Sequence, residues 1–384
     1  MKIAFLTPEY PHPNIVGHSG GIGTSILSLA KALTVLGHTI SILVYEQDAD
    51  DYFTEEGIHF YKIKNIKVKG LSLFLTQKKV ERLINTLHKS GKIDLVEAPD
   101  WTGFTAFIKP KCPLIIRENG SDTYFCHLDQ RPVKFKNKFL EKRARQHADG
   151  IISVSAFTGT LTNQLLGLNK SFTVIPNSVD ASLFQPKHLE SKNVSLLYFG
   201  TLIRKKGLLE LPEIFNLVHK TNNDVELILV GKDSGDIKTG SASTWELMKP
   251  LFDASAFKKV KYLGAVDYSK IQDLIKEATV CVFPTFAEAL PVSWLEAMAM
   301  EKAVVASNIG WANEMIADGK EGFLVHPTQH QQYAQRILEL LENPEKQKQF
   351  GAAAREKVKT HFSHELVAER SIAFYKTILN HNKN

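Results

Sequence analysis

Residues 284–306 read PTFAEALPVSWLEAMAMEKAVVA and hold the most informative pattern of the chain. The apolar run TVCVF (279–283) directly before them predicts a strand, which the following proline ends. Pro291 suits the first turn of a helix, because the N–H that proline lacks would have no partner there. Glu288 is therefore expected in a loop at the carboxyl end of a strand, and Glu296 on the apolar face of the next helix. A carboxylate on such a face needs a partner.

Glu288 and Glu296 have an ordinary structural explanation on spacing alone, as a solvated loop acid and an acid that favours the helix dipole. However, the segment resembles the E-x7-E motif of the retaining glycosyltransferases of family 4, which have the GT-B fold. The resemblance implies that Glu288 binds hydroxyls of the donor sugar and that Glu296 binds the ribose of the nucleotide.

A glycine-rich turn near the start of the chain resembles the N-terminal glycine loop of the same family. A helix is predicted to begin at Gly20, Gly21 and Gly23. Its apolar residues recur at helical spacing, and Gly37 is expected to end it. Glycines let the backbone approach a phosphate or a sugar closely, and a helix N-terminus offers free N–H groups. The resemblance implies that this loop contacts the donor.

The segment FGTLIRKKG (199–207) resembles the loop that clamps the donor diphosphate in the family. Thr201 stands where the family commonly has an arginine, Lys206 is retained, and Arg204 or Lys205 is the candidate for a second charge. Cations aimed at the leaving diphosphate stabilise charge that grows in the transition state. A basic surface loop is the alternative interpretation of the RKK triplet.

The segment LIIRENGSDTYF (114–125) departs from the family, which often has a histidine here, in an H-G-x-D pattern, against the donor sugar. Asn119 stands in that place; asparagine donates and accepts hydrogen bonds but does not titrate near neutrality. The substitution is compatible with sugar positioning and puts any role for an ionisable group in doubt. Two further segments resemble family landmarks: IPNSVDASLFQP (175–186), with Ser178 in place of the usual glycine, and GWANEMIADGKEGFLVHP (310–327).

Length and composition indicate a globular protein of two domains. The chain has 384 residues, of which 43% are hydrophobic and 23% charged. No apolar run approaches the length needed to cross a bilayer, and the start does not resemble a signal peptide. Cys112, Cys126 and Cys281 have no metal-like spacing, which favours free thiols in a reducing cytoplasm. We expect a cytoplasmic protein.

The net charge of +6 is unevenly distributed. Residues 131–148 hold seven Lys and Arg against one acid, and four lysines between residues 62 and 69 form a second basic run. A basic face beside Phe135 and Phe139 suits anionic lipid at the inner face of the membrane, or an acidic acceptor. A solvated helix face is the alternative. No nucleic-acid recognition motif accompanies the charge, so a nucleic acid is not expected as a partner.

Strand-like runs alternate with helical stretches up to Pro186, where the pattern restarts. The expected strands are 2–7, 39–44, 58–63, 93–98, 114–117, 151–154, 172–175, 194–199, 225–230, 260–264, 279–283, 303–307 and 323–325. This α/β alternation predicts two Rossmann-like, doubly wound domains facing a central cleft, the GT-B arrangement, with ligands at the carboxyl ends of the strands. We predict an N-terminal acceptor-side domain over 1–178, a nucleotide-sugar-binding domain over 179–365, and a C-terminal helix over 366–384. The resemblance implies that this helix crosses back onto the N-terminal domain; a polar tail, HNKN, ends the chain.

The resemblance implies a retaining hexosyl-type glycosyltransferase, which moves a sugar from a nucleotide-sugar donor to the hydroxyl of a sugar or lipid-linked acceptor. Synthesis of a surface polysaccharide or glycoconjugate is the expected context. The expected site residues are Glu288, Lys206, Arg204 and Asn119 for catalysis, Gly20, Gly21, Gly23, Gly200, Thr201, Gly264, Val266, Leu290 and Glu296 for the donor, and Asp100 and Trp101 for the acceptor. The ring of Trp101 suits stacking on a sugar, and packing in the core is its alternative explanation.

No metal or other cofactor is expected, because cations and helix N-termini carry the charge of the leaving group in this scheme. Asp48-Ala49-Asp50 matches a D-x-D metal motif and is interpreted as part of a solvated loop. A nucleotide-sugar 2-epimerase and a catalytically silent nucleotide-sugar-binding protein of the same fold remain alternatives. The donor base and sugar, the acceptor and linkage, and the oligomeric state cannot be inferred from the sequence.

Overall fold

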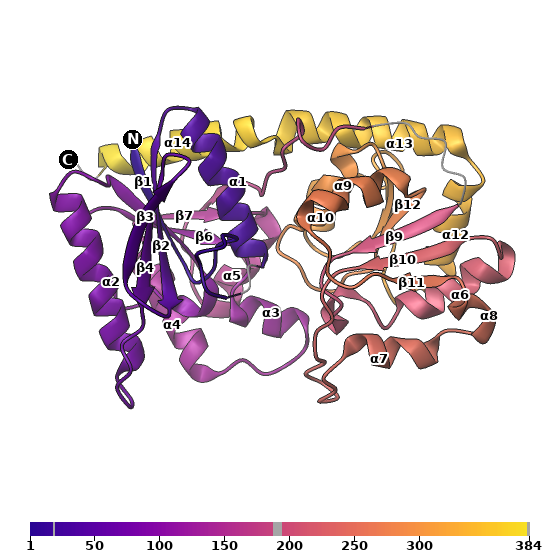
Figure 1. Ribbon diagram of the computed structural model, residues 1–384, viewed down its shortest axis with the longest axis horizontal. Helices are drawn as coiled ribbons and strands as arrows, with labels where there is room; N and C mark the ends of the chain where they lie inside the picture. Colours follow the sequence, from indigo (N-terminus) through magenta and orange to yellow (C-terminus); the bar gives the residue numbers. More distant parts are fainter. Residues whose placement is uncertain (18–19, 187–193, 382–384) are drawn as a thin grey trace. The chain divides into compact units, whose positions relative to one another are not determined.

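The computed structural model describes residues 1–17, 20–186 and 194–381 of the chain. The last three residues of the HNKN tail lie outside the described residues. The chain divides into two compact units: Met1–Ser178 together with His364–Asn384, and Val179–Ser363. Both units have the doubly wound α/β architecture that the sequence predicts (Figure 1).

The described strands of the N-terminal unit form an eight-stranded sheet in the order β3-β4-β2-β1-β5-β6-β7-β8. They are β1 (Lys2–Thr7), β2 (Thr39–Gln47), β3 (Asp51–Glu55), β4 (Ile58–Lys64), β5 (Leu95–Pro99), β6 (Leu114–Glu118), β7 (Gly150–Ser153) and β8 (Thr173–Val174). All pairings are parallel except that of β3 with β4. The sequence analysis missed β3, whose largely exposed residues carry no buried apolar pattern; Asp51 begins this edge strand.

Helices cover both faces of this sheet, because its central strands bury side chains in both directions. Along β1, Ile3 and Phe5 pack in a core with α1 (Gly21–Val35) and α14 (His364–His381). Ala4 and Leu6 point the other way, into a core with α2 (Ser72–Lys89). Figure 1 shows α1 and α2 on opposite sides of the sheet. The remaining helices of the unit are η1 (Trp101–Gly103), α3 (Asp122–Leu128), α4 (Phe135–His147) and α5 (Ala156–Leu166).

The helix α14 is held to the N-terminal unit by a buried polar network as well as by apolar packing. Glu97 on β5 pairs with Arg117 on β6, at 2.6 Å between Oε1 and Nε. The Tyr375 hydroxyl of α14 donates to the second Glu97 oxygen at 2.6 Å, and Arg117 donates to Ser371 Oγ of α14 at 3.2 Å. Each member satisfies the others in a setting that excludes water, so the register of α14 on the sheet is specified.

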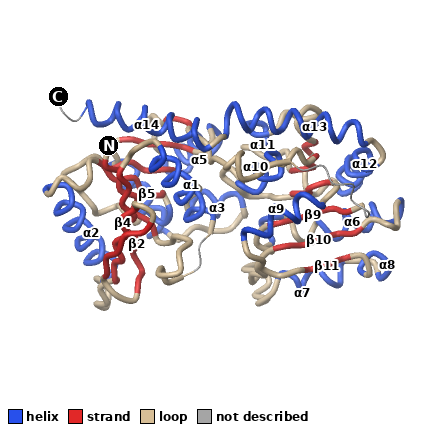
Figure 2. The backbone as a smooth tube through the Cα atoms, turned by 45° about the horizontal axis from the view of Figure 1, so that its top comes forward, coloured by secondary structure: helices blue, strands red, loops and turns tan. Residues whose placement is uncertain are grey.

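The described strands of the C-terminal unit form a six-stranded parallel sheet in the order β11-β10-β9-β12-β13-β14. They are β9 (Ser195–Phe199), β10 (Glu226–Val230), β11 (Val260–Tyr262), β12 (Val280–Phe283), β13 (Ala303–Ala306) and β14 (Phe323–Leu324). Figure 2 shows β9, β10 and β11 side by side. All the residues of β9, β12 and β13 are buried, as expected for central strands with helices on both faces.

Helices follow the strands of this unit in alternation. They are η2 (Arg204–Lys206), α6 (Leu211–Thr221), α7 (Thr244–Met248), η3 (Lys249–Leu251), α8 (Ala254–Phe257), α9 (Tyr268–Glu277), α10 (Val292–Ala299), α11 (Ala312–Met315), α12 (His330–Leu341), α13 (Pro344–Lys357) and the π-turn η4 (Val358–Phe362). The helix α10 begins at Val292, with Pro291 as its N-cap. The carboxyl ends of β9 and β12, which are neighbours in the sheet, thus carry the two motif loops that the sequence singled out.

Candidate functional site

The loop after β9 passes very close to the loop after β10. Gly200 donates its N–H to the Val230 carbonyl at 2.9 Å, with a φ of +145°. A Cβ on Gly231 would lie 1.9 Å from the Gly200 carbonyl oxygen, so only glycine fits there. Thr201, next in the chain, is exposed. The Thr201 side chain carries no charge, so the positive charge of this loop comes from residues further along the chain.

The basic segment of the same loop is fixed against the end of β12. Gly207 has a φ of +73°, and a Cβ on it would lie 1.7 Å from the Pro284 carbonyl oxygen. The N–H groups of Phe286 and Ala287 donate to the Lys205 carbonyl at 2.8 and 3.2 Å. The two motif loops are therefore joined through their backbones, which determines where the neighbouring side chains lie.

Lys206 and Glu288 form an ion pair at the junction of these loops, with Nζ 2.7 Å from Oε1. Both side chains are partly buried. Lys206 Nζ also lies beside Gly200, 3.5 Å from the position that a Cβ on this glycine would take. One cation and one carboxylate thus meet at the carboxyl ends of neighbouring strands, where this architecture places ligands.

Glu296 lies on α10 and is only 5% exposed. Its carboxylate accepts a hydrogen bond from the Tyr268 hydroxyl at the first residue of α9. Burial raises the pKa of Glu296 to about 7, against the effects of the Tyr268 hydrogen bond and the charge of Lys206, which both favour the ionised form. A buried carboxylate near a lysine, with a pKa close to neutrality, is typical of a functional site.

Arg204 is engaged by a residue that the sequence analysis did not single out. Its guanidinium makes a two-point contact with Asp236, with Nε to Oδ1 at 2.8 Å and Nη2 to Oδ2 at 2.7 Å. The hydrogen bonds from Arg204 hold the pKa of the Asp236 carboxyl well below its usual range. Arg204 is thus held by the Asp236 carboxylate at two points, whereas Lys206 pairs with the Glu288 carboxylate.

The other donor-side residues of this unit line the same edge. The Gly264 carbonyl, after β11, accepts from the Gly231 N–H at 2.8 Å, and the Gly264 φ is +69°. Val266 is half-buried between β11 and α9, and Leu290 is buried just before α10. Gly264 is thus hydrogen-bonded to Gly231, which itself packs against the Gly200 carbonyl in the loop that carries Lys206.

In the N-terminal unit, the first turn of α1 already holds a carboxylate. Glu9 Oε1 accepts a hydrogen bond from the Gly23 N–H at 2.9 Å. A Cβ on Gly20 would lie 3.2 Å from the same oxygen, whereas Gly21 has open space around it. Glu9 thus binds an N–H group that was expected to contact the nucleotide-sugar donor. The sequence offered one signal for it, an acid between the first strand and the glycines.

Asp100 and Asn119 lie side by side at the ends of β5 and β6. The Asn119 N–H donates to Asp100 Oδ1 at 3.0 Å. Asp100 Oδ2 and Asn119 Oδ1 are buried and accept no hydrogen bond from any residue that the structure describes. Burial, followed by repulsion from Glu141, raises the pKa of Asp100 to about 7. The structure therefore makes Asp100 a support for the Asn119 backbone within this unit.

Trp101 lines a cavity of about 370 Å³ at the carboxyl edge of the N-terminal sheet. The cavity walls are Pro8, Tyr45, Glu46, Asn65, Ser72, Leu73, Thr76, Trp101, Thr102 and Phe104. Two of them, Glu46 and Thr102, have left-handed backbones, with φ of 65° and 51°. Strained backbone of this kind tends to occur at functional sites. Trp101 is only half-buried, so a role at the cavity suits it better than packing in the core.

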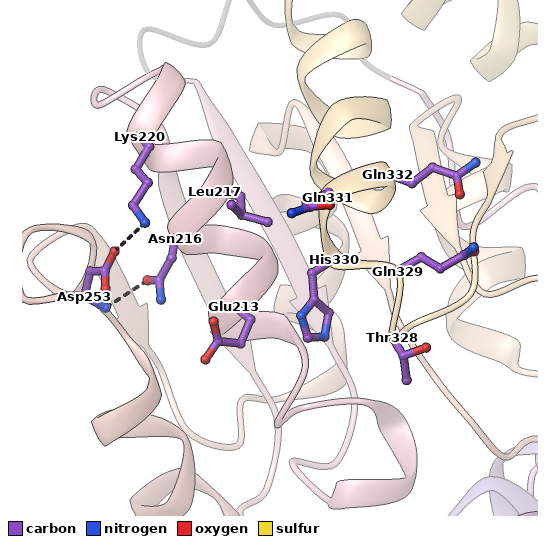
Figure 3. A pocket seen from close by; sticks show the side chains of 10 residues that line it. All are labelled: Glu213, Asn216, Leu217, Lys220, Asp253, Thr328, Gln329, His330, Gln331 and Gln332. Carbon is purple, nitrogen blue, oxygen red and sulfur yellow. Dashed lines mark hydrogen bonds and ion pairs between the residues drawn. The ribbon is translucent and has the colours of Figure 1, made fainter.

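Figure 3 shows a second cavity, of about 590 Å³, between α6 and the start of α12. Two of its charged side chains pair, since Lys220 Nζ lies 3.4 Å from Asp253 Oδ2, and the Asp253 backbone N–H donates to Asn216 Oδ1 at 2.9 Å. His330, which points into the same space, contacts Glu210 at 2.5 Å. None of the motif residues lines this cavity, and we assign it no ligand.

The acids of the D-x-D match are paired with lysines. Asp48 lies 3.1 Å from Lys62, and Asp50 lies 2.6 Å from Lys79. The Lys64 N–H also donates to Asp50, at 2.8 Å. Within residues 1–17, 20–186 and 194–381, the His, Cys, Asp and Glu side chains form no group suited to hold a metal ion.

The basic segment 131–148 contains α4, and its first turn is strongly exposed. Phe135 is 85% exposed and Phe139 49%, next to the exposed Lys134, Lys136 and Lys138. Further along α4, Glu141 is buried and accepts from two N–H groups at the start of α3. Among the described helices, none is both long and apolar enough to cross a membrane.

Two family models match consecutive parts of the chain. A model described as Glycosyltransferase Family 4 matches residues 19–183, and a model described as Glycosyl transferases group 1 matches residues 180–357. Together with the relatives described below, these matches support the conclusion that the chain is a glycosyltransferase. Its fold is GT-B.

The similarity to individual proteins extends over nearly the full length. Alpha-maltose-1-phosphate synthase of Mycolicibacterium smegmatis is 28% identical, over 98% of this chain and 100% of the relative. The solved sucrose-phosphate synthase from Thermosynechococcus elongatus has a TM-score of 0.79 at 19% identity, covering 99% of this chain and 100% of that one. Anabaena HepE, solved with UDP and glucose, has a TM-score of 0.76 at 20% identity, covering 98% and 99%.

Proposed function

We propose that the protein transfers a hexosyl group from a nucleotide-sugar donor to an acceptor hydroxyl, with retention of the anomeric configuration. The observation that carries the proposal is the contact of Lys206 with Glu288, 2.7 Å apart and close to the buried Glu296. The E-x7-E resemblance and the similarity to sugar synthases support the assignment of these residues to a donor.

In the proposed mechanism, Lys206 binds the diphosphate of the donor. The negative charge of this group grows as the bond to the sugar breaks, and a cation placed beforehand stabilises it without reorganisation. Glu288 then accepts hydrogen bonds from hydroxyls of the donor sugar, and Glu296 from the ribose. Each carboxylate thereby orients one half of the donor around the phosphate that Lys206 holds.

We propose that the reaction needs no metal ion, because Lys206 and backbone N–H groups supply the positive charge at the diphosphate. Asp48 and Asp50, the residues of the D-x-D match, are engaged by Lys62 and Lys79, which supports a structural role for them. A chelator should therefore leave donor binding and turnover unchanged.

We assign the acceptor to the N-terminal unit, at the cavity beside Trp101. An indole ring next to Tyr45 and Phe104 suits the flat apolar face of a sugar, and Glu46 and Asn65 offer polar groups for its hydroxyls. A lipid-linked sugar of a surface polysaccharide or glycoconjugate is the acceptor class we favour. The exposed Phe135 and its neighbouring lysines support contact with an anionic membrane that carries such an acceptor.

The first experiment measures thermal unfolding with UDP-glucose, GDP-glucose and ADP-glucose, each with and without EDTA. A ligand at a hundred times its Kd adds about 2.7 kcal/mol of stability. A shift with one nucleotide class that survives EDTA supports the donor site and its independence of metal. Absence of a shift with all three contradicts the donor assignment and favours a protein without nucleotide-sugar binding.

A further inference from the structure

Tyr268 is open to solvent and also hydrogen-bonded to a buried carboxylate. Half of the residue is exposed (50%), yet its hydroxyl donates to the carboxylate of Glu296, which is 5% exposed. Burial is the main cause that raises the pKa of the Tyr268 hydroxyl. The hydroxyl therefore stays protonated and donates a hydrogen bond throughout the neutral pH range. The aromatic ring is accessible from solvent while its polar end reaches into the site.

The position of Tyr268 in the chain brings it next to the nucleotide assignment made above. It is the first residue of α9 and follows the loop of Gly264 and Val266. Its ring lies edge-on to Phe184, with centroids 6.0 Å apart. Within the described part of the chain, no other side chain donates a hydrogen bond to Glu296.

We propose that the Tyr268 hydroxyl takes the place of a ribose hydroxyl in the ligand-free protein, and that it leaves Glu296 when a ribonucleotide binds. The inference rests on the proposed function, in which Glu296 accepts from ribose. A buried carboxylate without a donor is costly, so the ligand-free protein needs a group at this position. A ribose brings two hydroxyls to the same carboxylate and repeats the contact that Tyr268 makes.

The exposure of Tyr268 makes this exchange feasible without opening the core. A tyrosine at the start of a helix can turn toward solvent by a change of side-chain rotamer, and half of Tyr268 is already exposed. The exchange has a cost, since the Tyr268–Glu296 hydrogen bond is lost. Tyr268 therefore lowers the affinity for nucleotides and acts as a competitor that only a ribose-bearing ligand displaces.

The test compares wild type with Tyr268→Phe by titration calorimetry with UDP, GDP and ADP, and with inorganic pyrophosphate. Phenylalanine keeps the ring and removes the competing hydroxyl, so the nucleoside diphosphate that binds wild type should bind about three- to tenfold more tightly. Pyrophosphate has no ribose and should bind both proteins equally. Tyr52→Phe is the matched control, because its hydroxyl contacts His59 at the surface of the other unit.

Each outcome decides the inference. Tighter nucleotide binding with unchanged pyrophosphate binding supports it. Unchanged nucleotide binding overturns it, and weaker binding overturns it as well, because the hydroxyl would then hold Glu296 in place for the ribose. If wild type binds none of the three nucleoside diphosphates, the donor assignment of the proposed function fails, and the inference fails with it. Thermal unfolding of both variants confirms that they are folded.

Discussion

Lys206 Nζ lies 2.7 Å from Glu288 Oε1, across the ends of the neighbouring strands β9 and β12. In the ligand-free protein the carboxylate therefore balances the cation that we assign to the donor diphosphate. In the proposed mechanism, binding of the diphosphate exchanges this partner for a stronger one and releases Glu288 for the hydroxyls of the sugar. The pair would thus link recognition of the two halves of the donor.

Lys206→Met should weaken the binding of nucleoside diphosphates by roughly tenfold to a hundredfold, since a hydrogen bond to a charged group contributes about 1.5–3 kcal/mol. Titration calorimetry measures the change. Lys249→Met is the control, because the described contacts of Lys249 are with Glu246 and the Trp245 ring, and neither is a motif residue. Equal affinities in the two variants would show that Lys206 is not at the diphosphate.

Gly207→Ala should destabilise the C-terminal unit by at least about 3 kcal/mol, because a Cβ would collide with the Pro284 carbonyl in addition to the cost of a positive φ. Gly240→Ala is matched to it: the φ of Gly240 is +75° and its surroundings are open, so only the conformational cost of about 1–2 kcal/mol applies. Urea unfolding compares the two. Equal losses would contradict the close contact between the loops.

Glu296 should make the protein less stable as the pH rises. Its folded pKa of about 7 lies above the ordinary value of 4.5, so the folded state holds a proton that the unfolded state releases. The stabilising effect of this proton is complete below pH 4.5 and is lost as the pH passes through 7. Between pH 5 and pH 8, the free energy of unfolding of wild type should therefore fall by up to roughly 3 kcal/mol relative to that of Glu296→Gln.

Urea unfolding of both proteins at these two pH values measures the Glu296 effect. Asp100, whose pKa is also raised to about 7, contributes equally to both proteins and cancels in the comparison. A difference between wild type and Glu296→Gln that does not change with pH would mean that Glu296 stays ionised throughout this range.

Glu97→Gln should lower the free energy of unfolding by about 3–5 kcal/mol, because it leaves Arg117 without a charged partner in the buried network under α14. Tyr375→Phe should cost less, about 1–2 kcal/mol, since it removes one neutral donor. Glu56→Gln, at an exposed ion pair with Lys31, should change the free energy of unfolding by less than about 1 kcal/mol. Equal effects of Glu97→Gln and Glu56→Gln on urea unfolding would contradict a stabilising role for the network.

The sequence was sufficient to predict the architecture, because long apolar runs alternate with helical periodicity and each motif follows a strand. It did not reveal β3, an edge strand with a polar pattern that local periodicity reads as a loop. Glu9, Asp236 and Tyr268 also went unnoticed. Each contacts a motif residue that lies 14 to 32 positions away in the chain, so its role arises only when the loops fold together.

The role of Glu288 in sugar transfer is tested by the rate at which nucleoside diphosphate is released from the donor that the thermal shifts select. The rate is measured with and without hydroxyl acceptors in wild type, Glu288→Gln and Glu246→Gln. Glu246 is an exposed acid of the same unit and serves as the control. We expect acceptor-dependent release by wild type and Glu246→Gln, and a rate at least a hundredfold lower in Glu288→Gln, about the loss seen when one group that stabilises a transition state is removed. Equal rates in Glu288→Gln and wild type, or no release by wild type, would contradict this expectation.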